Sequence, residues 1–329
     1  MPIKGSWAVK YLPFAWSTFQ LILLASVWGI GEAWIGKQSS TVTVTSVDED
    51  VNPFREFNVW LNSFFFSKAL MAKAEEKFGQ LIGHIIFTYV RDLVAGFIVY
   101  YAVNLPWHWY IYIRHGNHFF PEEGSQPKWE VIWDQMLLAQ CSLFVYAMLP
   151  VTSQLLIEYG YTRVYYSMSD VGGWQWYAAY MAAYLLFVEF GIYWVHRTLH
   201  TNKFLYKHVH ALHHKYNKPT TLSPWASIAF NPVDGVAQAS PYVAGLFLIP
   251  CHYFTHLAML FFTGVWATNI HDTLHGNTEP VMGSKYHLVH HTHYHYNFGQ
   301  FFILFDWLYG TLKRPEDIKK AKAALKKTN

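Results

Sequence analysis

Long stretches without a charged residue divide this chain. Four of them are long enough to matter, namely residues 11–31, 93–113, 136–157 and 235–270. A fifth stretch, 171–195, contains a single charged residue, Glu189. Because a helix that crosses a bilayer needs about 20 predominantly apolar residues, each of these stretches predicts membrane-spanning helix.

The stretch 235–270 is too long for one crossing. Its 36 residues would reach roughly 54 Å as a single helix, whereas the hydrocarbon core of a bilayer is about 30 Å thick. Pro250 lies near its middle, where a turn would be needed. The stretch therefore predicts a helical hairpin that returns the chain to the side it left.

The basic residues indicate an orientation. They gather between residues 196 and 218 and again from Lys313 to Lys327, and the positive-inside rule places such loops in the cytosol. Counting crossings from there gives six, with both termini cytosolic. The segment 11–31 can also be interpreted as a cleavable signal peptide, but its apolar run continues to Trp34, which favours a membrane anchor.

The composition supports a membrane protein. Only 14% of the residues are charged, against about 25% in soluble domains. The net charge of +3 is modest, and no basic patch interleaved with aromatic residues indicates nucleic-acid binding. The predicted fold class is all-α, a polytopic membrane helical bundle with a cytosolic helical cap. Cys141 and Cys251 lie in apolar runs and predict neither a disulfide framework nor a thiolate metal site.

Ten histidines fall in four short blocks at the ends of the predicted membrane helices. The blocks read H-R-T-L-H, H-A-L-H-H, H-D-T-L-H and H-L-V-H-H, and they contribute His196, His200, His210, His213, His214, His271, His275, His287, His290 and His291. Residues three and four apart share one face of a helix, so each block presents two or three imidazoles together. Ten imidazoles exceed the ligands of one metal ion, so the pattern predicts two metal ions close together.

Two other chemistries compete with this interpretation. A metal transporter would place ionisable groups deep in the membrane, and a haem protein needs one or two axial ligands rather than ten. Carboxylates commonly orient metal-bound histidines, and the candidates are Glu189, Asp234, Asp272 and Asp306, with Glu189 first because it lies inside a membrane segment. His252 and His256 repeat the spacing at the predicted hairpin tip, a bilayer away, and are predicted not to be ligands.

The residues around the blocks resemble a known family. F-V-E-F-G-I-Y-W-V-H-R (187–197), N-K-P-T-T-L-S-P-W-A-S-I-A-F-N-P-V-D-G (217–235), T-N-I-H-D-T-L-H-G-N (268–277) and F-D-W-L-Y-G-T-L (305–312) are similar to the sterol C-5 desaturases of the fatty acid hydroxylase/sterol desaturase superfamily. The resemblance covers about residues 95–315. It implies that the ten histidines named above are the metal ligands.

The resemblance also implies a chemistry. The family holds two non-haem iron ions, for which zinc can substitute in purified samples, and uses O2 to introduce the C5–C6 double bond of Δ7-sterols. Electrons come from NAD(P)H through cytochrome b5 and its reductase, in the endoplasmic reticulum membrane. The same core in relatives supports a lipid hydroxylase or a sterol methyl oxidase, which remain alternatives. Thr221 and Ser223 are expected to be either substrate-side polar groups or loop caps.

These inferences define the expected organisation. Residues 1–92 form an N-terminal extension with a candidate anchor, 93–315 the catalytic domain, and 316–329 a basic cytosolic tail. Lys326 and Lys327 in that tail fit a dilysine signal for retrieval to the endoplasmic reticulum. The candidate catalytic residues besides the ligands are Glu189, Thr221 and Asp234.

Overall fold

The computed structural model describes residues 52–218, 220–272, 279–318 and 320. The candidate anchor 11–31, the dilysine pair and His275 lie outside these residues. The described chain is helical, with these elements: α2 (Pro53–Asn62), α3 (Lys68–Phe78), α4 (Gln80–His108), η1 (Trp109–Arg114), α5 (Gly116–Phe119), α6 (Trp129–Tyr146), α7 (Met148–Glu158), β1 (Val164–Tyr165), η2 (Met168–Val171), α8 (Trp174–Thr201), α9 (Lys203–Leu205), η3 (Tyr206–His210), η4 (His213–Lys215), η5 (Pro224–Ile228), α10 (Pro232–Leu248), β2 (Cys251–His252), α11 (Tyr253–Ile270), α12 (Ser284–His293) and α13 (Leu304–Leu308).

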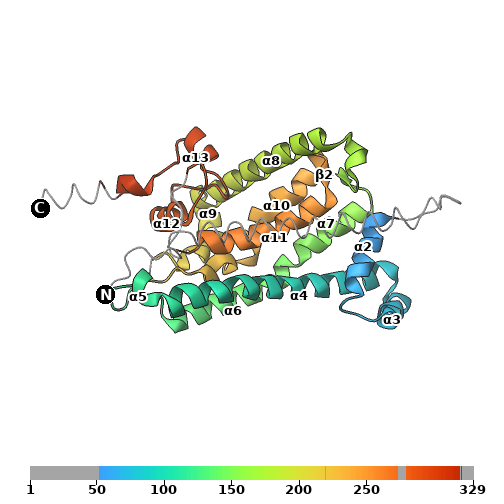
Figure 1. The fold of residues 1–329 in the computed structure, drawn as a ribbon, viewed down its shortest axis with the longest axis horizontal. Helices are drawn as coiled ribbons and strands as arrows, with labels where there is room; N and C mark the ends of the chain where they lie inside the picture. Colours follow the sequence, from blue (N-terminus) through green and yellow to red (C-terminus); the bar gives the residue numbers. More distant parts are fainter. Residues whose placement is uncertain (1–51, 219, 273–278, 319, 321–329) are drawn as a thin grey trace, which may run out of the picture.

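Three helical stretches among the described residues are long and apolar enough to cross a membrane: Gln80–Arg114, Trp129–Glu158 and Trp174–Thr201. They contain three of the predicted segments, so the prediction of a polytopic helical membrane protein is confirmed for these. Figure 1 shows the hairpin α10–α11 between α8 and α4, and contacts confirm that α10 packs on α8 while α11 packs on α4.

The hairpin has the predicted form. Helix α10 ends at Leu248, Pro250 lies in the turn, and α11 begins at Tyr253. In the turn, Cys251 and His252 pair in parallel with Val164 and Tyr165, which ties the tip to the segment before α8. Helices α8 and α10 approach closely at Gly191, where an added Cβ would lie 2.7 Å from the Pro241 side chain of α10. Both ends of the hairpin therefore return to one end of the molecule.

The second membrane helix begins before its charge-free stretch. Residues 80–92, which belong to the N-terminal extension expected from the sequence, form the first turns of α4. Arg91 does not end the helix because its guanidinium donates to Asn62 Oδ1 at 3.0 Å and to the backbone oxygen of Asn58 at 3.2 Å, both on α2. Glu158 at the end of α7 joins the same region through His84 Nε2 at 3.0 Å. Buried charges stay inside a helix when they are paired and hydrogen-bonded.

Candidate metal centre

The histidine blocks converge at one end of the helical bundle. Helix α8 carries block one at its C-terminal end, the η3–η4 segment carries block two, His271 follows α11, and α12 carries block four. Block two is brought close by η3, a single π-helical turn ending at His210. Such turns often occur at functional sites because they rotate the following side chains out of the α-helical register.

The imidazoles form two separate groups. Within each group the nitrogen atoms offered as ligands lie within 4.8 Å of one another. The first group, cluster A, contains His196, His200, His210, His214 and His290; the second, cluster B, contains His213, His271, His287 and His291. The nine predicted ligands that fall in the described residues are therefore all present in the two clusters. His275 lies outside the described residues.

The distances inside the clusters fit metal coordination. His200 Nε2 lies 2.8 Å from His210 Nε2 and 3.1 Å from His214 Nε2. In cluster B, His287 Nε2 lies 3.2 Å from His271 Nε2 and 3.1 Å from His291 Nε2. Metal–imidazole bonds of about 2.0–2.1 Å place neighbouring ligand nitrogens about 3 Å apart. A set of nitrogens that all point inward at this spacing suits a cation between them.

Several ligands are oriented through their other ring nitrogen. His210 Nδ1 lies 2.7 Å from Asp234 Oδ2, and both side chains are fully buried. His196, His271 and His290 use Nδ1 toward the backbone oxygens of Phe298, Ala267 and Tyr296, at 3.0, 2.7 and 2.8 Å. A proton held on Nδ1 leaves Nε2 free to bind metal, which is the usual arrangement of metal-binding histidines.

Burial keeps these imidazoles in the neutral form that binds metal. Burial and the neighbouring histidines lower the pKa of His213, His214, His287 and His291 well below the ordinary value. Burial lowers the pKa of His290 to about 3, although the bond to the Tyr296 carbonyl opposes that shift. In addition, Nε2 of both His196 and His290 has no hydrogen-bond partner among the described residues. Such buried, unpartnered nitrogens are explained by a ligand role.

The candidate carboxylates differ in what they do. Asp234, at the start of α10, orients His210 as proposed and also accepts a bond from Gln238 Nε2 at 2.8 Å. The expectation that Glu189 orients a histidine was wrong. Its carboxylate accepts bonds from the backbone nitrogens of Gln300, Phe301 and Phe302 at 3.0–3.1 Å. A buried carboxylate needs several hydrogen-bond donors. The backbone of residues 300–302 supplies them, so the carboxylate of Glu189 does not bond to a histidine.

Asp306 and Asp272 bond to groups next to the histidines rather than to the imidazoles themselves. Asp306 accepts from the backbone nitrogens of Phe298 and Gly299, at 2.9 and 2.8 Å, and so holds the segment whose carbonyl binds His196. Asp272, next to His271, accepts a bond from Trp107 Nε1 at 2.6 Å. Sequence reasoning named these carboxylates, but the carbonyls of Phe298, Ala267 and Tyr296 carry no sequence signal because every residue has one.

The structure also places the two hydroxyl residues of the block-two loop and the two histidines of the hairpin tip. Thr221 is not on the substrate side: its Oγ1 accepts from Lys218 N at 3.1 Å and donates to Lys218 O at 3.2 Å, which closes a turn. The hydroxyl of Ser223 donates to Gln135 Oε1 on α6. Thr221 therefore closes its own loop, the alternative considered for it. Ser223 makes no cap and instead links η5 to α6. As predicted, His252 and His256 belong to neither cluster; they bond to Thr255 and Tyr184 at the hairpin tip.

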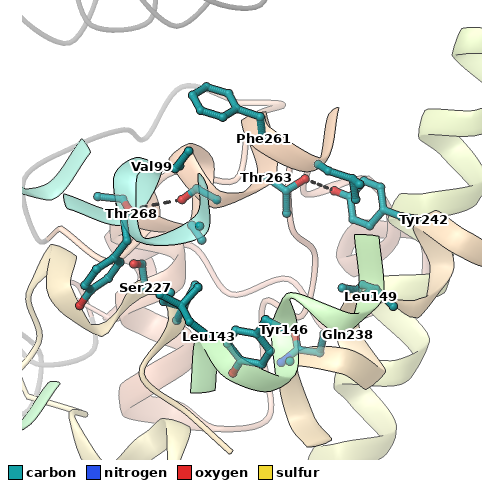
Figure 2. A pocket seen from close by; sticks show the side chains of 18 of the residues that line it. Val99, Leu143, Tyr146, Leu149, Ser227, Gln238, Tyr242, Phe261, Thr263 and Thr268 are labelled. Atoms are coloured by element: carbon teal, nitrogen blue, oxygen red, sulfur yellow. Dashed lines mark hydrogen bonds between the residues drawn. The ribbon is translucent and has the colours of Figure 1, made fainter. Parts of the chain in front are cut away.

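An apolar cavity of about 420 Å³ reaches the clusters. Its lining comes from α4, α6, α7, η5, α10 and α11, and four histidines, His196, His213, His271 and His287, form part of its wall. Figure 2 shows the cavity with Ser227 and Thr268 on one side and Leu149 and Tyr242 on the other. Its volume falls in the range of pockets that hold small apolar ligands. The sequence did not predict this cavity, because its walls come from elements far apart along the chain.

Together the fold and the site define a helical membrane protein with two buried histidine clusters, each able to hold a metal ion, beside an apolar cavity. Residues 181–311 match the family model described as fatty acid hydroxylase. The chain is 45% identical over 232 residues, 70% of this chain, to "Putative Delta(7)-sterol-C5(6)-desaturase 2" of Arabidopsis thaliana, of which 82% is covered. It is 41% identical over 260 residues, 78% of this chain, to "Delta(7)-sterol-C5(6)-desaturase" of Nicotiana tabacum, of which 95% is covered.

More distant relatives agree. "Lathosterol oxidase" of Rattus norvegicus is 37% identical over 177 residues, which are 52% of this chain and 58% of the rat protein. No solved structure matches this chain significantly. The chain belongs to the family of Delta(7)-sterol-C5(6)-desaturases.

Proposed function

We propose that this protein is a membrane-bound, O2-dependent oxidoreductase that introduces the C5–C6 double bond into Δ7-sterols. The observation that carries the proposal is the contact between two histidine clusters and one apolar cavity. His196 of cluster A and His213, His271 and His287 of cluster B line the space where an apolar ligand would lie. The printed names of the relatives supply the substrate class.

Two non-haem iron ions are the metals we propose, one for each cluster. The residues fit them, because imidazole nitrogen is a ligand suited to iron and the ligand nitrogens of each cluster lie together. When bound, the iron ions would supply the activation of O2. Cluster B has four described ligands. The resemblance implies that His275, outside the described residues, is a further ligand of the centre. Zinc would bind the same nitrogens and can replace iron in purified protein.

The overall reaction balances with an external electron donor. The sterol loses one hydrogen from C5 and one from C6, and two electrons go with them. O2 takes up four electrons and becomes two water molecules, so two further electrons must arrive. We propose NAD(P)H as their source, through cytochrome b5 and its reductase. Lys203 and Lys207 are exposed on α9 and η3, directly before His210 of block two, and offer a basic surface to an acidic carrier.

The chain's own residues prepare the centre for this reaction. Asp234 and the carbonyls of Phe298 and Tyr296 hold the Nδ1 protons of their histidines and fix the ring orientations. Glu189 and Asp306 hold the backbone of residues 298–302 against α8. The cavity wall excludes water from the reacting carbons. The proposed location is the endoplasmic reticulum membrane, with metal site and both termini in the cytosol, supported by the basic residues around the blocks.

A lipid hydroxylase is the second candidate, favoured by the family model that matches residues 181–311. The product separates the two. Purified protein in detergent or nanodiscs is supplied with a Δ7-sterol, NADH, cytochrome b5, its reductase and air, and the products are identified by mass spectrometry. We expect a Δ5,7-sterol, two mass units lighter than the substrate, and none without O2. A product sixteen units heavier would contradict desaturation and support hydroxylation.

A further inference from the structure

The cavity wall contains a buried serine, Ser227, whose hydroxyl makes no hydrogen bond to the described residues. It lies in η5, between α6 and α11, and is 2% exposed. Its Oγ has no hydrogen-bond partner among the described residues. A buried hydroxyl without a partner is unfavourable, and native proteins keep few of them. Its retention in a cavity wall suggests that a ligand completes the bond.

The other hydroxyls of the described cavity wall already have partners. Tyr100 donates to the backbone oxygen of Trp225 at 2.9 Å, and Tyr146 donates to that of Phe230 at 3.3 Å. Thr268 donates to the oxygen of Gly264 at 3.3 Å, within its own helix. The remaining pair, Thr263 and Tyr242, bond to each other at 2.6 Å. Ser227 therefore offers the unpartnered hydroxyl of this part of the chain to a ligand in the cavity.

Ser227 lies at the metal end of the cavity. Thr268 lies on the same side of the cavity as Ser227 in Figure 2, on α11, which packs on η5, and it is three residues before His271 of cluster B. Ser227 itself is three residues before Phe230, whose ring packs against the His213 ring with centroids 4.9 Å apart. The helix that packs on η5 and the segment that follows Ser227 therefore both reach ligands of cluster B.

The chemistry of a sterol requires a polar partner at that end. The 3-hydroxyl of a Δ7-sterol is attached to C3, and C3 is separated from C5 by C4 alone. When C5 and C6 are brought to the metal centre, the 3-hydroxyl must come with them, while the aliphatic side chain extends into the distant part of the cavity. A group that recognises the hydroxyl must therefore lie beside the metal clusters.

We propose that Ser227 Oγ forms the hydrogen bond that recognises the sterol 3-hydroxyl and sets which carbons face the metals. This inference rests on the proposed function and identifies a substrate-positioning residue of the same site. One hydrogen bond of this kind changes kcat/KM about five- to tenfold. Because Ser227 Oγ has no hydrogen-bond partner among the described residues, its removal should leave the fold intact.

The test compares two substrates in wild-type protein and the S227A variant. The substrates are a Δ7-sterol and the same sterol with hydrogen in place of the 3-hydroxyl. Wild-type protein should prefer the hydroxylated sterol in kcat/KM, and S227A should lose that preference about five- to tenfold while turning over the deoxy sterol like wild type. The control is T268V, whose hydroxyl already bonds to its own helix, and it should keep the preference. The melting temperature of S227A should equal or exceed that of wild type.

The failing outcomes are distinct. Equal loss of both substrates in S227A would assign Ser227 a structural role and overturn the inference. A wild-type protein without preference between the substrates would also overturn it, while desaturation itself stands. A wild-type protein that converts neither sterol would refute the proposed function, and the inference with it.

Discussion

The imidazole rings of His213 and His214 lie at 81° to each other, with centroids 5.3 Å apart, and belong to different metal clusters. Neighbouring residues of one short 3₁₀ turn point in different directions, so block two supplies His210 and His214 to cluster A and His213 to cluster B. Block four divides in the same way, with His290 in cluster A and His287 and His291 in cluster B. The two H-x-x-H-H blocks therefore join the clusters.

This division predicts selective metal loss. H214A should deplete cluster A and H213A cluster B, so each variant should retain about one metal ion where wild type holds two, with desaturation abolished in both. Metal content of purified protein by mass spectrometry measures this. H252A, at the hairpin tip, is the control and should keep both ions and most activity. Two ions retained in H213A or H214A would remove that residue from the ligand set.

The bond between Asp234 and His210 predicts a change in affinity. D234N keeps the size of the side chain but removes the charge that stabilises the metal-bound imidazole. Loss of such a partner lowers metal affinity about 10- to 100-fold, so iron should leave D234N at lower chelator concentration. D134N is the matched control, since Asp134 is half-exposed and pairs with Lys215. Equal chelator resistance of D234N and wild type would contradict the orienting role.

Glu189 predicts an effect on stability rather than on ligation. E189Q can accept bonds from the backbone of residues 300–302 with one oxygen but brings an NH2 group against the same nitrogens. Hydrogen bonds to charged groups contribute about 1.5–3 kcal/mol, so E189Q should lower the free energy of unfolding by about 2 kcal/mol. E76Q, on the exposed face of α3, should change it little. Wild-type stability with lost metal would instead assign Glu189 to the ligand shell.

The buried histidines predict acid sensitivity. Burial lowers the folded pKa values of His213, His214, His287 and His291 well below the ordinary value, and lowers the pKa of His290 to about 3. Stability is therefore fully present above about pH 6.5 and is lost as the pH falls toward 3, because the unfolded chain binds protons that the folded chain excludes. In that window each of these histidines lowers the free energy of unfolding by about 1.4 kcal/mol for every unit that the pH falls. Thermal unfolding of the chelated protein should be flat from pH 7 to 8 and fall below 6.5; a flat profile down to pH 5 would contradict neutral, buried imidazoles.

The cavity predicts a variant that loses substrate but keeps metal. A Cβ on Gly264 of α11 would lie 4.0 Å from Val99, an ordinary contact, so G264A should stay active. G264L would extend further into the cavity and should reduce turnover at least tenfold without changing metal content. Sterol turnover and metal analysis of both variants measure this. Full activity of G264L would place the substrate elsewhere.

The sequence was sufficient for some of these features and insufficient for others. Long apolar stretches predicted the helices around 93–113 and 171–195 and the hairpin turning at Pro250, because apolar length is a local property of the chain. The histidine spacing predicted which imidazoles gather at one centre, and the nine in the described residues form the two clusters. The division of block two between clusters depends on a π-turn and a 3₁₀ turn that spacing does not encode.

The errors have a common physical cause. Glu189 and Thr221 were interpreted from their chemical type and position. Glu189 is instead satisfied by backbone groups far away in the sequence, and Thr221 by its own turn. Ser227 drew no attention in the sequence, since one serine in a loop has no distinguishing pattern. Its lack of a partner becomes visible when α6, η5 and α11 are assembled.

The central claim is that this chain desaturates Δ7-sterols at its histidine clusters. Its most direct test is expression in yeast lacking its own sterol C-5 desaturase, with the sterols analysed by gas chromatography–mass spectrometry. Wild-type chain should restore Δ5,7-sterols, and H290A, expressed to the same level, should restore none. Unchanged Δ7-sterols in cells that contain the wild-type protein in their membranes would contradict the account.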